Sequence, residues 1–319
     1  MVEKTFCVFD VVGRYGDVFN LFKDYRIKAL RAGVALDMKA YREELDAIAA
    51  FRRGECDLVS LSDVGVRQFN RFTGSVSAIG AVPHYGDLKV LTYTLANRRL
   101  SPLLQNDEYE VLGVLPLGSV YLYVKDRSID TVEELAGQRI TVFPNHSDAR
   151  HMVEYVHAQP VPTPISKFAE LFNGGAADIS YAPAAAYEVL EMSEGMGARG
   201  GIVRYPLGQF TAQLVAHKDA FPERFVKRSR KLVASLFSDA LRITFRYERA
   251  IPDDRWIDIP DVAKREYQEM LRQVRLDILD GNAGPDVANV YHPKMLKLLR
   301  KIRCHTNPAA AECRAEERE

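Results

Sequence analysis

The sequence lacks a charge imbalance and a long apolar run. Its 319 residues include 43 lysines and arginines and 43 aspartates and glutamates, so the formal net charge is zero. Nucleic-acid binding needs a basic excess or stripe, and this balance therefore argues against a nucleic-acid partner. A membrane-spanning helix needs about 20 consecutive apolar residues, and no stretch of the sequence approaches that length. Hydrophobic residues at 47% and charged residues at 27% are typical of a globular protein large enough for two domains.

Motifs of common enzymes and metal sites are also missing. The sequence has no Cys-x-x-Cys, no Gly-x-Ser-x-Gly, no phosphate-binding loop and no His-Glu-x-x-His. We therefore expect no metal and no cofactor. Cysteine is scarce, and the four residues are Cys7, Cys56, Cys304 and Cys313. Their even number allows two disulfides, with free buried thiols as the alternative. Because Cys304 and Cys313 bracket a short polar loop, we expect them to pair, and Cys7 with Cys56 is the other pair considered.

The sequence does contain a regular alternation of strand and helix patterns. Strands are expected over 5–13, 34–41 and 56–62, and helices over 17–33 and 42–53, the second with Leu45, Ile48 and Ala49 on one face. The pattern restarts near residue 120 and continues to about 206. Two more strands, 201–207 and 211–219, precede a mostly helical region after Pro222. Such alternation is typical of parallel α/β sheets.

One unit of this pattern occurs twice. "FRRGECDLVSLSD" and "LFNGGAADISYAP" align when Asp57 is placed on Asp178, which also places Gly54 on Gly175. Each copy ends a helix with glycine and enters a strand through aspartate. We expect the glycines to take the left-handed turn and the aspartates to accept backbone hydrogen bonds. The repeat suggests two matched domains, 1–118 plus 207–250 and 119–206 plus 251–319. They would be joined by ordered strands near 116–122 and 203–210 rather than form one continuous sheet.

At this point the sequence resembles periplasmic solute-binding proteins, most closely those of tripartite ATP-independent periplasmic (TRAP) transporters. The stretches that carry the resemblance are "GVLPLGSVYLYVKDRSIDTVEELAGQRITVFPN" and "PVPTPISKFAELFNGGAADISYAPAAAYEVL". It covers about residues 1–250 and extends to a divergent group of solute-binding proteins associated with drug efflux. The resemblance implies an α/β, two-domain periplasmic binding protein-like fold (type II), with a ligand cleft between the domains and a helical C-terminal region. It also implies a periplasmic location, although the first ten residues read as a strand and not as a signal peptide.

The chain departs from the family at the position that usually binds a ligand carboxylate. Thr141 stands where these proteins have an arginine, so another group must recognise the ligand. Arg14 is the best replacement, because a guanidinium pairs with planar anions through two hydrogen bonds. Helix-start amides near Asn145 and Ser147 also suit an anion, although either residue can simply cap the helix. Aromatic rings would favour a larger, less charged ligand.

The candidate ligand-binding residues follow the predicted strands, where the ligands of open α/β sheets bind. They are Asp10, Arg14, Tyr15, Ser60, Ser62, Asp63, Tyr85, Phe143, Asn145, His146, Ser147, Tyr181 and Phe210.

We expect a monomeric binding protein that captures a small organic ligand by domain closure and delivers it to a membrane transporter. The rival class is an enzyme on the same fold, similar to lyases that act on menaquinone precursors. Its chemistry would have to use Asp10, Asp63, His146 or Asp148, and the absence of catalytic motifs disfavours it.

Overall fold

The computed structural model describes residues 1–309 and 311–313, and the chain divides into two compact units. Unit 1 comprises Met1–Val76, Gly86–Leu117 and Phe210–Ile243. Unit 2 comprises Ser77–Tyr85, Gly118–Gln209 and the chain from Thr244 on. The segment Ser77–Tyr85 thus groups with unit 2, although it lies within the range expected for the first domain. The backbone of this segment is hydrogen-bonded to residues of unit 2. Gly80 N donates to Leu207 O at 2.8 Å, and Ala81 O accepts from Arg303 at 2.7 Å.

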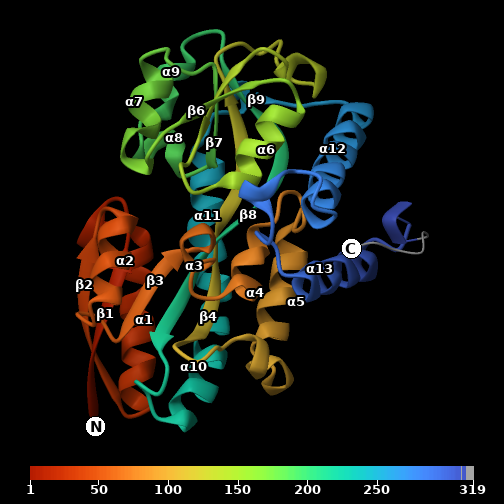
Figure 1. The fold of residues 1–319 in the computed structure, drawn as a ribbon. Coiled ribbons are helices and arrows are strands. Elements are labelled where there is room, and N and C mark those ends of the chain that lie inside the picture. The colour runs from red at the N-terminus through yellow and green to blue at the C-terminus, as the bar shows by residue number, and fades with distance from the viewer. Residues whose placement is uncertain (310, 314–319) are drawn as a thin grey trace. The chain divides into compact units, whose positions relative to one another are not determined.

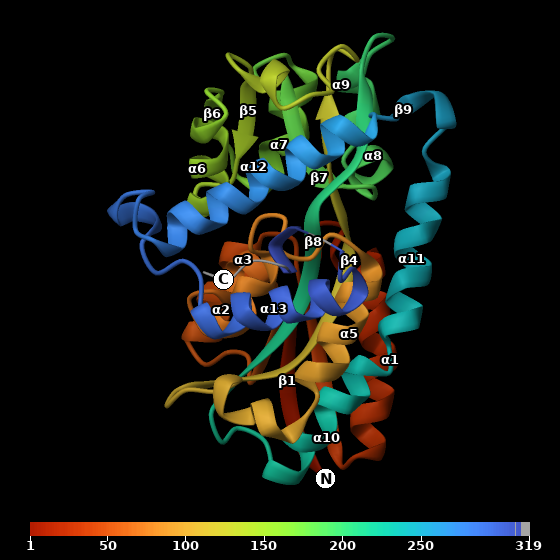
Figure 2. The same cartoon turned by 90° about the vertical axis from the view of Figure 1, so that its right-hand side faces the viewer.

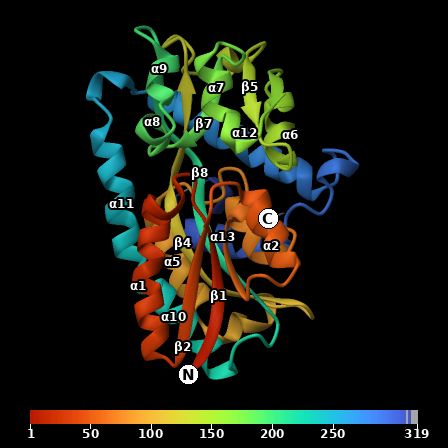
Figure 3. The ribbon, with the colours of Figure 1, turned by 90° about the vertical axis from the view of Figure 1, so that its left-hand side faces the viewer.

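Unit 1 is built on a sheet whose strands follow the order β2-β1-β3-β8. The strands β1 (Val2–Phe9), β2 (Val34–Tyr41) and β3 (Leu58–Ser62) are parallel, and β8 (Gly201–His217) is antiparallel to β3. Figure 3 shows β1 and β2 between the helices α1 (Asp17–Arg31) and α2 (Glu44–Arg52). The other helices of unit 1 are α3 (Asp63–Val66), α4 (Arg71–Gly74), α5 (Tyr85–Leu95), α10 (Glu223–Ala234) and the first half of α11 (Phe237–Ala250).

Aromatic side chains fill the core of unit 1 on the α1 side of the sheet. The ring of Phe6 packs edge-on against Phe22 and Tyr25, at centroid distances of 5.3 and 6.0 Å. Of the face expected on α2, Ile48 is buried and Ala49 half-buried, but Leu45 is 63% exposed, and the other buried residues are Ala47, Ala50 and Phe51. The helix is anchored through Phe51 near its end, which turns Leu45 toward solvent.

Unit 2 is built on a second set of strands in the order β4-β7-β5-β6. These are β4 (Tyr109–Val124), β5 (Arg139–Val142), β6 (Gln159–Pro162) and β7 (Ile179–Pro183), and the short β9 (Trp256–Ile257) pairs with β8. The helices are α6 (Ser147–Tyr155), α7 (Phe168–Asn173), α8 (Ala186–Val189), α9 (Met192–Met196), α12 (Asp261–Leu279) and α13 (Pro293–Thr306). Figures 1 and 2 both place α12 beside α6. Short 3-10 helices lie at Gly13–Tyr15, Ser75–Ser77, Arg98–Leu103, Glu133–Leu135, Ile165–Lys167, Asp253–Arg255, Pro285–Val287 and Ala311–Cys313.

Two long strands are shared by the units. The chain passes from unit 1 to unit 2 between Leu117 and Gly118 within β4, and returns between Gln209 and Phe210 within β8. The two strands expected at 201–207 and 211–219 are therefore one strand. Because β4 and β8 are neighbours, the strands of the described residues form one nine-stranded sheet, in which eight strands follow one order and β9 pairs with β8 beside it. The expectation of separate sheets is wrong in this respect, although the crossings occur within the expected segments.

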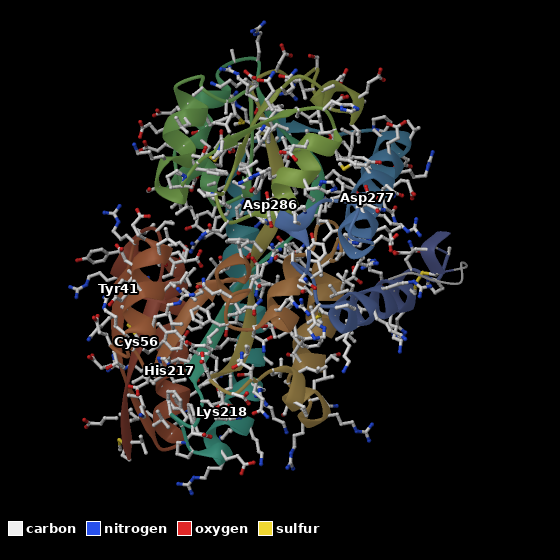
Figure 4. The ribbon with its side chains drawn as sticks, in the orientation of Figure 1. Tyr41, Cys56, His217, Lys218, Asp277 and Asp286 are labelled. Atoms are coloured by element: carbon white, nitrogen blue, oxygen red, sulfur yellow. A yellow bond between two sulfur atoms is a disulfide. The ribbon has the colours of Figure 1, made fainter. Side chains whose placement is uncertain are left out.

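Both expected disulfides are present. Cys7 of β1 pairs with Cys56 just before β3, with Cα atoms 5.8 Å apart, and Cys304 of α13 pairs with Cys313, with Cα atoms 5.5 Å apart. Figure 4 shows Cys56 and His217 within unit 1, where the His217 ring stacks on Phe51 at 4.1 Å. Across residues 1–309 and 311–313, no helix has the length and apolar character that crossing a bilayer requires.

Candidate functional site

The repeated unit has the same hydrogen bonds in both places. In unit 1, Asp57 N donates to Thr5 O at 3.0 Å, and Asp57 Oδ2 accepts from Thr5 N at 2.8 Å. In unit 2, Asp178 N donates to Arg139 O at 2.8 Å, and Asp178 Oδ2 accepts from Arg139 N at 3.0 Å. Each aspartate thus ties the start of its own strand to the neighbouring parallel strand, at the middle of β1 in unit 1 and at the start of β5 in unit 2. The preceding glycines have φ of +75° and +82°, as the left-handed turn requires.

Asp57 and Asp178 therefore have a structural role. They fix the starts of β3 and β7, and with them the paths of these strands toward their carboxyl ends. The residues after β3 and β7 are held in a fixed register by these clamps at the opposite ends of the strands. Most candidate ligand-binding residues lie in or directly after these and the neighbouring strands, and each unit is described in turn.

In unit 1, Asp10 follows β1 and is 5% exposed. Its Oδ1 accepts from Val12 N at 2.9 Å and its Oδ2 from Phe19 N at 3.1 Å, so the carboxylate satisfies amides at the start of α1. An added Cβ on Gly16 would lie 2.0 Å from Asp10 Oδ1, which shows how closely the backbone surrounds this group. Burial raises the pKa of Asp10, while the backbone hydrogen bonds lower it. Asp10 is thus engaged in holding the helix.

Ser62 ends β3 and Asp63 begins α3, and both are likewise engaged within unit 1. Ser62 Oγ accepts from Gly65 N at 3.1 Å and caps α3. The Asp63 side chain is fully buried, and its Oδ2 accepts from both Thr211 N and Thr211 Oγ1 at 3.0 Å. Burial raises the pKa of Asp63 to about 7, although these hydrogen bonds and the charge of Arg67 lower it.

The remaining residues of unit 1 differ in exposure. Arg14 is exposed and Tyr15 is 80% exposed, both in the 3-10 helix after β1, so both are accessible to a ligand. Ser60 is 1% exposed within β3, and Phe210 is half-buried on β8. A carboxylate that sequence reasoning missed lies beside this strand end. Glu44 of α2 accepts from Ser62 N at 2.6 Å, and burial raises its pKa.

In unit 2, the candidate residues Phe143, His146 and Tyr181 form one aromatic cluster. His146 Nδ1 lies 3.0 Å from Tyr181 Oη. The half-buried Phe143 ring is parallel to His146 at 6.1 Å and edge-on to Tyr181 at 5.8 Å. Phe168, which carried no signal in the sequence, stacks on Phe143 at 4.5 Å and completes the cluster. Such a set of rings can pack against a planar ligand, while His146 and Tyr181 supply polar atoms.

A buried carboxylate lies next to this cluster. Asp148, on α6, is fully buried, with Oδ1 3.3 Å from His146 Nε2. Its Oδ2 accepts from Tyr291 Oη at 2.7 Å. Tyr291 is also only 3% exposed and lies 143 residues away along the chain. No local pattern in the sequence could have found this partner.

The other polar candidates of unit 2 have different roles. The N-cap of α6 is His146, and no side chain caps the helix, so the capping role expected for Asn145 or Ser147 is wrong. Asn145 is exposed and Ser147 half-buried. Thr141, at the position where a carboxylate-binding arginine is usual, is fully buried, with its hydroxyl 2.6 Å from Ser180 Oγ. It therefore belongs to the interior of the sheet.

Tyr85 makes its hydrogen bonds with residues outside the aromatic cluster. It donates to Glu248 Oε1 at 2.6 Å, and Tyr121 donates to the same oxygen at 2.9 Å. Tyr85 Oη also accepts from Ser119 N at 2.8 Å. Burial and the nearby Glu248 charge raise the pKa of Tyr85, so its hydroxyl stays protonated. Tyr85 thus joins α5, β4 and α11 and is a structural linker as well as a candidate.

Comparison with known proteins decides the family. Residues 26–318 match the sequence profile of the family described as "Solute-binding protein AdeT 1/2". The chain belongs to this family. It is 35% identical over 306 residues to "Probable solute-binding protein AdeT1" of Acinetobacter baumannii, a match that covers 96% of this chain and 98% of the relative. It is 26% identical over 243 residues to "Probable solute-binding protein AdeT2" of the same organism, covering 75% of this chain and 98% of the relative.

Solved structures with the same fold are TRAP periplasmic solute-binding proteins. One from Anaerococcus prevotii, with bound D-glucuronate, has a TM-score of 0.75 at 11% identity and covers 96% of this chain and all of its own. One from Desulfovibrio salexigens, with bound orotic acid, has a TM-score of 0.73 at 10% identity and covers 96% of this chain and 99% of its own. These likenesses confirm the predicted α/β fold of type II binding proteins. The chain is thus a solute-binding protein of the AdeT 1/2 family with a TRAP-like fold.

Proposed function

We propose that this protein is an extracytoplasmic solute-binding protein that captures a small organic ligand by closure of its two units. It would act in the periplasm as a monomer and deliver the ligand to a membrane transporter. The observation that carries the proposal is the aromatic cluster of Phe143 and His146, which follow β5, with Tyr181 of β7, in a chain of the solute-binding family. This is where open α/β sheets bind their ligands.

The residues of unit 1 that support ligand binding are the exposed Arg14 and Tyr15. A guanidinium would pair with a carboxylate or another planar anion, and a phenol ring can stack on a ring-bearing ligand. Asp10, Ser62 and Asp63 would act behind them by fixing the strand ends, since their oxygens already accept backbone hydrogen bonds. Unit 1 would then contact the ligand mainly through Arg14 and Tyr15.

The alternative function is an enzyme on the same fold. The specific observation that favours it is the contact of His146 with both Tyr181 and Asp148, because a histidine between a hydroxyl and a carboxylate can act as a general base. We prefer binding without turnover, because the relatives are named as solute-binding proteins and the Tyr181 ring packs edge-on against both Phe143 and Phe168.

The test is native mass spectrometry of protein isolated from the periplasm of its host, followed by calorimetry. A co-purified small molecule should appear as an added mass and rebind to stripped protein with a stoichiometry of one. Orotate, D-glucuronate and succinate serve as first probes, because they represent a planar ring acid, a sugar acid and a simple dicarboxylate. No added mass, together with no heat from any probe, would count against binding. Recovery of the ligand as a chemically changed product would instead favour the enzyme.

A further inference from the structure

A chain of four contacts leads from the aromatic cluster to the segment Ser77–Tyr85. Tyr181 contacts His146 at 3.0 Å, and His146 Nε2 lies 3.3 Å from Asp148 Oδ1. Tyr291 donates to Asp148 Oδ2 at 2.7 Å and accepts from Ile79 N at 3.2 Å. We propose that Asp148 and Tyr291 are positioning residues that couple the ligand-facing pair, His146 and Tyr181, to this segment. The inference rests on the proposed function for the role of the pair, and on the contacts alone for the coupling.

Each hydrogen bond in this chain of contacts can be assigned a donor and an acceptor. A carboxylate only accepts hydrogen bonds, so Asp148 requires the proton of neutral His146 to be on Nε2. His146 Nδ1 is then an acceptor, and Tyr181 must donate its hydroxyl proton to it. At the other end, Tyr291 uses its proton on Asp148, so its oxygen is the acceptor for the Ile79 amide. Asp148 therefore sets the tautomer of His146 and, through it, the direction in which the Tyr181 hydroxyl points.

Burial makes these contacts costly to break. Asp148 is fully buried, Tyr291 is 3% exposed, and Tyr181, Ile79 and His146 are 7%, 8% and 9% exposed. In such surroundings a polar group that loses its partner has no water to replace it, so the groups tend to shift together. A ligand that moves Tyr181 or His146 would thus also move Asp148 and Tyr291.

The chain of contacts ends at Ile79, in a segment of unit 2 that is flanked on both sides by backbone of unit 1. The backbone belongs to unit 1 up to Val76, to unit 2 from Ser77 to Tyr85, and to unit 1 again from Gly86. Within unit 2, Arg275 donates to Ile79 O at 2.6 Å, and Gly80 has φ of +65°, with Leu271 Cβ 2.7 Å from where its Cβ would lie. Residues other than glycine are strained at such a φ, so Gly80 permits the turn that follows the Ile79 amide.

The coupling is tested in the ligand-free protein by two measurements. Long-range 1H–15N spectra of histidine-labelled protein, with the His146 signals assigned from His146→Gln, should show the proton on Nε2. Amide exchange should show Ile79 exchanging about fivefold faster in Tyr291→Phe, which removes its acceptor, as the loss of one hydrogen bond typically gives. In Tyr181→Phe, at the far end of the chain, exchange of the same amide should rise about twofold or more.

Tyr267→Phe is the matched control, because Tyr267 is also buried in unit 2 and its hydroxyl donates only outside this chain of contacts, to Thr131 O at 3.3 Å. It should leave both the His146 tautomer and the Ile79 exchange rate unchanged. A proton on Nδ1 of His146, or an unchanged Ile79 rate in folded Tyr181→Phe protein, would overturn the coupling. If both effects appear but no compound binds, the coupling stands and the proposed function is the part that fails.

Discussion

Asp178 accepts three hydrogen bonds from Arg139, one from its backbone N at 3.0 Å and two from its guanidinium at 2.9 and 2.7 Å. The equivalent Asp57 accepts from Thr5 N and pairs with Lys4 Nζ, both at 2.8 Å. A basic side chain on the neighbouring parallel strand thus accompanies the aspartate in both copies. Each copy of the repeated unit therefore ties one strand to its parallel neighbour in the same way.

Asp178→Asn should therefore lower the free energy of unfolding by about 1–2 kcal/mol, because an amide cannot accept on both sides. The ion pair itself contributes little, since Arg139 is partly exposed. The hydrogen bonds of Arg139 lower the pKa of Asp178 in the folded state. The stabilisation is thus present above the ordinary aspartate pKa and is lost as the pH falls through the lowered value. Urea titrations of both proteins at pH 7 and pH 3 measure the difference, which should shrink at pH 3.

The opposite pH dependence is expected for Asp63. Its pKa is raised to about 7 by burial, so the folded protein binds a proton that the unfolded chain releases near pH 4. Its contribution to stability therefore falls as the pH rises from about 4 to about 7 and is constant above. Asp63→Asn removes this titration. The stability of the variant relative to wild type should rise by about 2–4 kcal/mol between pH 4.5 and pH 8, at about 1.4 kcal/mol per pKa unit. A difference that stays flat with pH would show that Asp63 titrates normally.

Local signals in the sequence were sufficient for the elements and for the repeat. Gly33, Gly54 and Gly175 all take positive φ after a helix, as their positions indicated. The division into strands 201–207 and 211–219 was wrong, because β8 continues through residues 208–210 as it passes from one unit to the other. The partnership of Asp148 with Tyr291 joins residues 143 apart and has no periodic or spacing signal. The sequence could therefore suggest candidate residues near strand ends but not the hydrogen-bond partners that join them.

The C-terminal disulfide should be a measurable part of the stability of unit 2. Cys304–Cys313 closes a loop of sequence separation 9, for which chain entropy gives about 2–3 kcal/mol. It also holds Glu312, whose carboxylate accepts from Arg303 at 2.9 and 2.7 Å in a buried pair. Cys304→Ser with Cys313→Ser should lower the melting temperature by several degrees, since 1 kcal/mol corresponds to about 2 °C in a chain of this size. In this double variant, a reductant should have no further effect through residues 304 and 313. The decrease in melting temperature should be smaller than that caused by Cys7→Ser with Cys56→Ser, because the Cys7–Cys56 disulfide closes a loop of sequence separation 49.

The last prediction separates ligand recognition from packing at Arg14 and Tyr181. Arg14 is exposed, so Arg14→Ala should leave the melting temperature unchanged while weakening the binding of an anionic ligand about 30-fold, as the loss of a charged partner typically does.

Tyr181 is 7% exposed and contacts Phe143, Phe168 and His146, so Tyr181→Ala would leave a cavity and destabilise the protein even without ligand. Tyr181→Phe keeps the ring and removes only the hydroxyl, so it should weaken the ligand by about tenfold with a small change in melting temperature. Calorimetry with the co-purified ligand measures both affinities. Lys23→Ala removes an exposed cation from the following helix, α1, and is the control for charge alone. An equal loss of affinity in that variant would mean that Arg14 acts at a distance rather than by contact.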